Sequence, residues 1–190
     1  MTQRPTAPSG RPLPGEYAPY AQSDIDSVVG TDASAVLTAM AVDTRGLLAS
    51  LSEDQVGGLR YAPEKWTLKE VLGHIIDDER IFAHRAFCLA RGESLPLPGF
   101  DEKVYAANSE AEVRPWADLL EEYQVVRAAS VALFRSLLPA AWGRAGEVNG
   151  YRATPRGLAF HIAGHELHHL RMVRARYLPL LEPPLAPPPN

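Results

Sequence analysis

Residues 154–178 read TPRGLAFHIAGHELHHLRMVRARYL, and this stretch carries the clearest helix signal of the chain. Thr154 is a favourable N-cap, and Pro155 suits the first helical position because the N–H that it lacks would have no partner there. Pro179 follows the stretch, and a proline cannot continue a helix. The sequence therefore predicts one long helix with sharp ends.

Three earlier segments show the same helical periodicity of apolar residues, at about 31–51, 67–91 and 115–138. The second of them opens with a capping box, in which Thr67 is the N-cap and Glu70 follows three residues later, and Gly92 suits its C-terminal end. The third begins at Pro115, which we expect to be its first helical residue. Four long helices with little strand predict an all-α protein built as a four-helix bundle.

Prolines mark the ends of the chain: five of the 17 lie in the first 19 residues and six in the last 12. A proline fixes φ and removes a backbone donor, so both ends are expected to be extended and not helical. We therefore divide the chain into a Pro-rich N-terminal extension (1–20), a four-helix bundle (21–178) and a Pro-rich C-terminal tail (179–190).

Two of the predicted connections between helices are distinctive. Residues 93–114 form a long loop that contains Pro96, Pro98 and Gly99, and loops of this length usually have a function or bind a partner. Asn149 and Gly150 lie between two short candidate strands, and this pair is typical of tight hairpins. We therefore expect a small hairpin before the last helix, while the long loop permits a helix order other than up-down-up-down.

The composition excludes several classes of protein. With 190 residues, of which 46% are hydrophobic and 22% charged, the chain fits one soluble globular domain. Its net charge of -4 and the lack of a basic block argue against a nucleic-acid partner. No apolar run reaches the roughly 18 residues of a membrane span, and the N-terminal extension lacks the apolar core of a secretion signal. Cys88 is the single cysteine, so no intramolecular disulfide can form, which favours the reducing cytoplasm.

Four of the six histidines fall within nine residues of the predicted last helix, at His161, His165, His168 and His169. Successive helical residues are turned by about 100°, which directs His165 and His169 into the middle of the apolar stripe and His161 and His168 to its rim. Two imidazoles one turn apart can share a metal ion. The alternative is a pair of core histidines hydrogen-bonded to facing helices, because burial without partners would cost roughly 1–3 kcal/mol each.

A third ligand would have to come from another helix, and the segment 67–91 offers two histidines. His74 lies at the inner edge of the apolar stripe of that segment, whereas His84 lies on the opposite, solvent side. His74 is therefore the better candidate. Asp78 also faces inward, one turn after His74, and Asp77 is the next carboxylate. Three roles are open for each of these two carboxylates. It is a metal ligand, a hydrogen-bond partner of a ligating histidine, or a solvated charge on the helix surface.

Two of these stretches resemble motifs of the DinB/YfiT-like family of metal-dependent enzymes. Residues 65–77, KWTLKEVLGHIID, resemble the W-[ST]-x-x-E-x-L-x-H segment of that family, and residues 160–169, FHIAGHELHH, resemble its second histidine motif. The Asn-Gly turn at 149–150, LPGFD at 97–101 and YAPY at 17–20 also match relatives of this group. The resemblance extends over nearly the whole chain, from about residue 17 to 178.

This resemblance implies a bundle with an up-down-down-up order of helices, often a homodimer, and a divalent ion held by three histidines. Carried over position by position, the metal ligands are His74, His165 and His169. His161 and His168 match positions that are frequently histidine in the family without being assigned ligands. The reaction is left open, because some relatives resemble transferases or isomerases that use low-molecular-weight thiols and others resemble hydrolases.

Three neutral nitrogens on a divalent ion would leave at least one coordination position for water or substrate, as in catalytic sites. Histidines without a thiolate suit Zn²⁺, Ni²⁺ or Fe²⁺. We therefore expect one divalent ion per chain and an enzyme that acts on a small-molecule substrate, either as a hydrolase or as a low-molecular-weight-thiol transferase. The alternative hypothesis is a non-catalytic bundle that binds or senses metal.

Three further residues have competing interpretations. Cys88 is expected to be a small buried hydrophobe and not a nucleophile. Trp66 precedes the N-cap of its helix and is expected to pack against that helix, with substrate stacking as the alternative. Arg176, two turns beyond the histidines, complements the dipole of the helix end, and the alternative role is to bind an anionic substrate.

Overall fold

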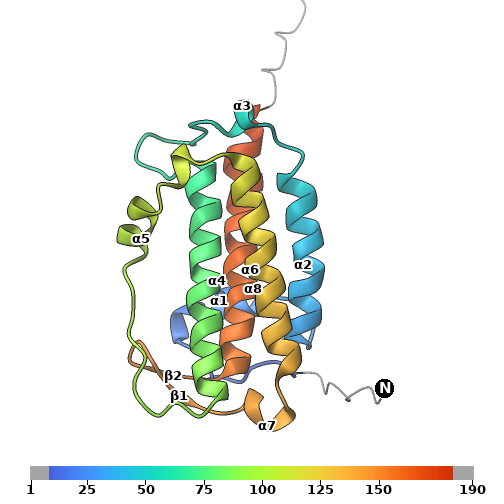
Figure 1. The fold of residues 1–190 in the computed structure, drawn as a ribbon, viewed down its shortest axis with the longest axis vertical. Coiled ribbons are helices and arrows are strands. Elements are labelled where there is room, and N and C mark those ends of the chain that lie inside the picture. Colours follow the sequence, from blue (N-terminus) through green and yellow to red (C-terminus); the bar gives the residue numbers. More distant parts are fainter. Residues whose placement is uncertain (1–8, 182–190) are drawn as a thin grey trace, which may run out of the picture.

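A computed structural model describes residues 9–181 of the 190-residue chain. Its four long helices are α2 (Ala33–Leu48), α4 (Leu68–Ala90), α6 (Trp116–Ser136) and α8 (Pro155–Met172). In Figure 1, α2 runs upwards, α4 and α6 run downwards, and α8 returns upwards. The predicted all-α bundle with an up-down-down-up order is thereby confirmed. Around the bundle, α6 packs against both α2 and α4, and α8 packs against both as well.

The caps that the sequence predicts fix the ends of two of these helices. The side chain of Thr67 accepts the N–H of Glu70, and the carboxylate of Glu70 accepts the N–H of Thr67 in return. At the start of α8, Thr154 accepts the N–H of Gly157. Two expected ends differ: Pro115 is the N-cap of α6 and not its first residue, and α8 ends at Met172 and not at about 178.

Short elements connect the long helices. They are the 3-10 turn η1 (Pro19–Ala21), α1 (Gln22–Asp26), α3 (Glu53–Val56), α5 (Glu102–Asn108), the 3-10 turn η2 (Ala111–Val113) and α7 (Pro139–Trp142). After α8, a π-helical turn η3 (Val173–Tyr177) and a 3-10 turn η4 (Leu178–Leu181) follow. The long loop runs from the lower end of α4 back along the outside of the bundle, through α5, to the upper end of α6 (Figure 1). This return lets α6 run parallel to α4.

The predicted hairpin is present and anchors the long loop. Strands β1 (Gly146–Val148) and β2 (Tyr151–Ala153) pair antiparallel. Asn149 and Gly150 between them have φ values of 50° and 78°, as a tight hairpin with two left-handed residues requires. Leu97 of the loop donates its N–H to Glu147 O at 2.9 Å and accepts the N–H of Asn149 at 2.9 Å. The start of the loop is therefore held against the hairpin.

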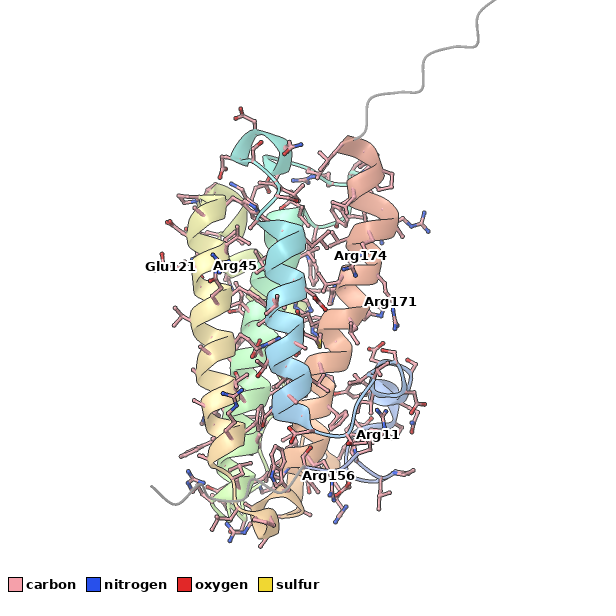
Figure 2. The ribbon with its side chains drawn as sticks, turned by 90° about the vertical axis from the view of Figure 1, so that its right-hand side faces the viewer. Arg11, Arg45, Glu121, Arg156, Arg171 and Arg174 are labelled. Atoms are coloured by element: carbon pink, nitrogen blue, oxygen red, sulfur yellow. The ribbon has the colours of Figure 1, made fainter. Side chains whose placement is uncertain are left out.

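The described part of the Pro-rich N-terminal segment packs on the lower part of α8. Tyr17 is buried, and the carboxylate of Glu16 accepts hydrogen bonds from Arg156, the closer at 2.7 Å. Arg11 donates to the carbonyls of Ile25 and Val28 in and just after α1. Figure 2 shows Arg11 and Arg156 together in this region. Residues 1–8 and 182–190 lie outside the described residues, and the proposed boundaries at 20 and 178 stay a prediction.

A buried polar network links all four long helices. Arg127 of α6 donates to the carboxylate of Glu79 of α4 at 2.9 Å and also pairs with Glu166 of α8. Glu166 further accepts the hydroxyls of Tyr123, at 2.8 Å, and of Thr44 from α2. Apolar clusters pack above and below this layer. Among the helices that the structure describes, none is both long enough and apolar enough to cross a membrane.

Candidate metal centre

Three histidines from two neighbouring helices meet at one point. His74 lies on α4, and His165 and His169 lie one turn apart on α8. The Nε2 atom of His165 is 3.0 Å from that of His74 and 3.1 Å from that of His169. One nitrogen from each ring lies within 4.8 Å of the other two. The structure thus brings together the three residues that the sequence singles out.

The chemistry of this donor set fits a divalent ion. A hydrogen bond between two imidazole nitrogens uses a proton on one of them, so three Nε2 atoms at one point cannot all be satisfied by one another. A cation that lies about 2.0–2.1 Å from each nitrogen would satisfy all three. The group could therefore hold a metal ion.

Burial keeps these imidazoles neutral, which is the state that binds metal. It lowers the pKa of His74, and it lowers the pKa of His165 to about 4 despite the attraction of Asp78. Burial, followed by the neighbouring histidines, lowers the pKa of His169 to about 2. At neutral pH the ring nitrogens therefore present lone pairs without first having to lose a proton.

Asp78 supports the cluster from α4, one turn after His74. Its Oδ2 lies 3.3 Å from Nδ1 of His165 and 3.7 Å from Nε2 of His161. Burial alone would raise the pKa of Asp78, but the neighbouring His165 and His161 outweigh it and lower the value to about 2. A carboxylate beside Nδ1 favours the tautomer in which Nε2 is free to bind metal. Nδ1 of His169, by contrast, is buried without a hydrogen-bond partner among the described residues.

The neighbouring Asp77 has no ion pair or hydrogen bond with the three histidines in the described part of the chain. It is half-buried and lies 3.7 Å from Arg80, and burial raises the pKa of its carboxyl against the attraction of that arginine. Of the two carboxylates that the sequence offers, Asp78 is therefore the one that contacts the histidines.

The other histidines lie outside the group of three. His161 is buried, with its ring stacked on Phe82 at a centroid distance of 3.8 Å. His168 is exposed, and its Nδ1 lies 3.4 Å from Asp24. His84 is exposed on α4, 3.6 Å from the sulfur of Cys88. The exposed positions of His168 and His84 agree with the expectation, whereas His161, expected at the rim of the apolar stripe, is buried because it packs against Phe82.

A cavity of about 500 Å³ opens beside His169. Its walls include Trp66, Glu102 of α5, Met172 and Tyr177. The Trp66 ring lies 4.8 Å from the ring of His74, so this side chain lines the cavity as well as packing near its helix. The motifs in the sequence do not single out Glu102. Asp101, a residue type that often caps helices, precedes it and is the signal that could have indicated the start of α5.

Two other candidates lie away from this cavity. Cys88 is half-buried, and burial raises the pKa of its thiol, which disfavours the reactive thiolate. Arg176 is exposed in the turn after α8 and is not part of the cavity wall. The expectation that Cys88 is not a nucleophile agrees with this placement, and no contact with the cluster supports Arg176 as an anion-binding residue.

Fold and site together define a class of protein: a four-helix bundle with up-down-down-up order and a three-histidine cluster between α4 and α8. Comparison with protein families is consistent with this class, because the model of the DinB superfamily matches residues 37–173. The chain belongs to the DinB superfamily, as the resemblance of its two histidine motifs predicts.

One similar solved structure is that of YfiT from Bacillus subtilis. That protein is described as "a probable metal-dependent hydrolase with an unusual four-helix bundle topology". The match has a TM-score of 0.63 at 16% sequence identity, and it covers 87% of this chain and 92% of the YfiT chain. The two proteins therefore share a fold. No curated protein matches this chain.

Proposed function

We propose that this protein is a metal-dependent hydrolase of small molecules, in which His74, His165 and His169 hold one divalent ion per chain through Nε2. The observation that carries the proposal is the convergence of three Nε2 atoms beside an open cavity. Membership of the DinB superfamily and the fold shared with YfiT, itself described as a probable metal-dependent hydrolase, support it.

The chain's own residues have defined parts in such a reaction. A divalent ion held by His74, His165 and His169 would supply Lewis acidity, which lowers the pKa of a coordinated water to near neutrality and polarises a carbonyl. Asp78 orients the His165 ring, and Trp66 and Tyr177 provide an apolar wall against which a substrate can pack. The carboxylate of Glu102, in the same cavity wall, can accept a proton that hydrolysis releases.

Several finer expectations stay predictions. They are the identity of the metal among Zn²⁺, Ni²⁺ and Fe²⁺, a low-molecular-weight thiol as substrate, a homodimer, and a cytoplasmic location. Light scattering of the purified protein tests the homodimer directly.

The test of the proposal combines metal content with turnover. Untagged protein is loaded with each metal, dialysed and measured by elemental analysis, and it is then assayed with esters, amides and thiols. We expect about one ion per chain and metal-dependent hydrolysis, both lost in His74→Ala and in His169→Ala. His168→Ala is the matched control on α8 and should keep both.

The other outcomes separate the alternatives. Stoichiometric metal without turnover in any assay would favour a binding or sensing bundle. Turnover only in the presence of a thiol would favour the transferase. Wild-type protein that retains no metal after dialysis would contradict the proposal.

A further inference from the structure

Arg85 is a buried cation on α4 without a carboxylate partner. Its side chain is 5% exposed, and no carboxylate within the described residues lies within ion-pair distance of it. Nη2 donates to the carbonyl of Pro98 at 2.6 Å, whereas Nε and Nη1 have no acceptor in the described part of the chain. The guanidinium carbon lies 4.8 Å from the ring centre of Phe82 and 5.6 Å from that of Phe100.

This arrangement differs from that of the other arginines near it. Arg127 is equally buried but has two carboxylates, and Arg80 is exposed and pairs with Glu122. A buried charge without a counter-ion is costly, and one carbonyl and two aromatic faces compensate only part of that cost. Burial accordingly lowers the pKa of Arg85. A guanidinium has five N–H donors, so several are free to bind another acceptor.

Arg85 lines a cavity of about 320 Å³ between α4 and the loop at residues 97–105. Besides Arg85, the cavity wall includes Arg80, His84, Phe100 and Tyr105, and no acidic residue. The loop is held in place, since a side chain at Gly99 would come within 2.2 Å of the Asn149 side chain of the hairpin. The cavity therefore combines two arginines with aromatic walls on a closely packed backbone.

A stack of side chains lies between this cavity and the metal centre. The Arg85 guanidinium lies on Phe82, the Phe82 ring stacks on His161 with an interplanar angle of 12°, and the His161 ring lies 5.8 Å from His165 at 10°. Along α4, His74, Asp78, Phe82 and Arg85 follow one another at helical spacing on one face. Arg85 is three turns from His74, about 16 Å along the helix axis, and among the described residues the cavity at Arg85 shares no wall residue with the cavity at His169.

The geometry points to Arg85 as the residue that binds a small organic anion, through a carboxylate or a phosphate group, in this cavity and apart from the metal centre. The fork of a guanidinium can hold either anion through two parallel hydrogen bonds. Phe100 and Tyr105 would pack against an apolar or aromatic part of the same molecule. The ligand class of this cavity is therefore a small organic anion.

The test uses three probes on metal-loaded protein: phenylacetate, phenyl phosphate and the neutral phenylacetamide. Binding is followed by isothermal titration and by the NMR signal of the Arg85 Nε–Hε group, which reports on the guanidinium and not on the metal. We expect at least one of the two anions to bind about tenfold or more tightly than phenylacetamide and to shift this signal. The stronger of the two anions identifies the group that the site prefers.

Variants localise the effect. Arg85→Met keeps most of the apolar stem and should abolish the preference for the anion, and Arg85→Lys should restore only part of it. Arg91→Met is the matched control. The guanidinium carbon of Arg91 also lies over an aromatic ring, 5.0 Å from the ring centre of Phe87, but Arg91 is exposed at the end of α4. This variant should bind the anions as the wild type does.

The outcomes distinguish this inference from the proposed function because metal content is measured for every variant. Anion binding that is unchanged in a fully metal-loaded Arg85→Met protein overturns the role of Arg85 and leaves the metal site untouched. If that variant does not fold, the wild type still decides: no shift of the Arg85 signal and equal affinity for all three probes overturn the inference. Loss of metal from wild-type protein would instead contradict the proposed function.

Discussion

His165 contacts a different partner through each of its ring nitrogens. Nδ1 faces the carboxylate of Asp78, and Nε2 faces His74 and His169. A neutral imidazole has one donor and one acceptor nitrogen, so a proton on Nδ1 beside the carboxylate leaves the lone pair of Nε2 for a metal. The carboxylate thus selects the tautomer that the cluster needs.

Replacement of Asp78 tests this role of the carboxylate. Asp78→Asn removes the negative charge beside Nδ1 of His165. The loss of a hydrogen-bond partner of this kind typically lowers metal affinity by roughly 10–100-fold. We expect a weaker metal affinity by about that factor in a competition titration with a chelating dye. Asp77→Asn is the matched control on the next residue and should change the affinity little. Equal affinities for the two variants would show that Asp78 does not orient the ligand.

Helical spacing alone selects His74, His165 and His169 as candidate ligands. The family resemblance implies the same three residues as the ligand set. Spacing ranks Asp78 before Asp77 but does not give the role of either carboxylate, because contacts with residues of other helices decide that role. Arg85 was missed because an arginine on an amphipathic helix is typical of a solvated position. It is buried here only because the loop at 97–105 covers it.

At the scale of elements, α8 depends on close contact with α1. A Cβ added at Gly164 would lie 2.6 Å from the backbone carbonyl of Asp24. Ile25 of α1 is buried in the same contact region. Glycine at this position lets the backbone of α1 pack directly on the helix that carries two of the three histidines.

Gly164→Ala should therefore destabilise the protein, by about 1–3 kcal/mol, because backbone atoms have to move to make room. Gly46→Ala is the matched control: Gly46 lies in α2 with open space around its Cα, so alanine should stabilise by up to about 1 kcal/mol. Urea unfolding of both variants measures the two free energies. A Gly164→Ala protein as stable as the wild type would show that the contact between α1 and α8 is loose.

The N-terminal segment makes the stability of the protein sensitive to acid. Burial would raise the pKa of Glu16, but hydrogen bonds from Arg156 and from the N–H of Leu13 outweigh it and hold the value below the usual 4.5. A carboxyl whose pKa is lowered by folding stabilises the folded state above its unfolded pKa, and this contribution is lost as the pH falls through the folded value.

Glu16→Gln should thus lower the free energy of unfolding at pH 7, by on the order of 1–2 kcal/mol. The difference from the wild type should shrink as the pH falls below about 4.5, because the wild-type carboxyl then becomes protonated. Urea unfolding at a series of pH values checks both points. A difference that stays constant down to the acid limit of folding would argue against the ion pair with Arg156.

Capping residues predicted several element ends well, as at Thr67 and Thr154, because a side-chain cap acts locally. The π-helical turn after Met172 was not predictable, since the apolar pattern continues through it without a break. Helix α5 was also missed. A helix this short is not stable alone, and contacts with α4 hold it in place.

At the scale of the whole molecule, Arg127 connects the bundle through Glu79 and Glu166. The hydroxyls of Thr44 and Tyr123 also donate hydrogen bonds to the carboxylate of Glu166. Glu166 follows His165 directly on α8 and comes three residues before His169. Because the network holds the Glu166 side chain, it fixes the rotation of α8 about its own axis and so the direction of both histidines. Within the described residues, the side chain of Glu166 makes its hydrogen bonds in this layer, with Arg127, Tyr123 and Thr44, and none with the three histidines.

Arg127→Met leaves two buried carboxylates without a counter-ion, and we expect a loss of about 3–5 kcal/mol in the free energy of unfolding. Arg135→Met is the matched control on the same helix. Arg135 is exposed and donates one hydrogen bond to Thr38 at 3.2 Å, so its replacement should change stability by about 0.5 kcal/mol or less. Similar stabilities for the two variants in urea would contradict a structural role of the network.

The central claim is that residues 91 positions apart in sequence bind one metal ion. A crystal structure of metal-loaded protein, with anomalous data collected at the absorption edge of the metal, tests it most directly. The account predicts one anomalous peak per chain, about 2.0–2.2 Å from Nε2 of His74, His165 and His169. A peak held by other residues, or no peak between these three rings, would contradict it.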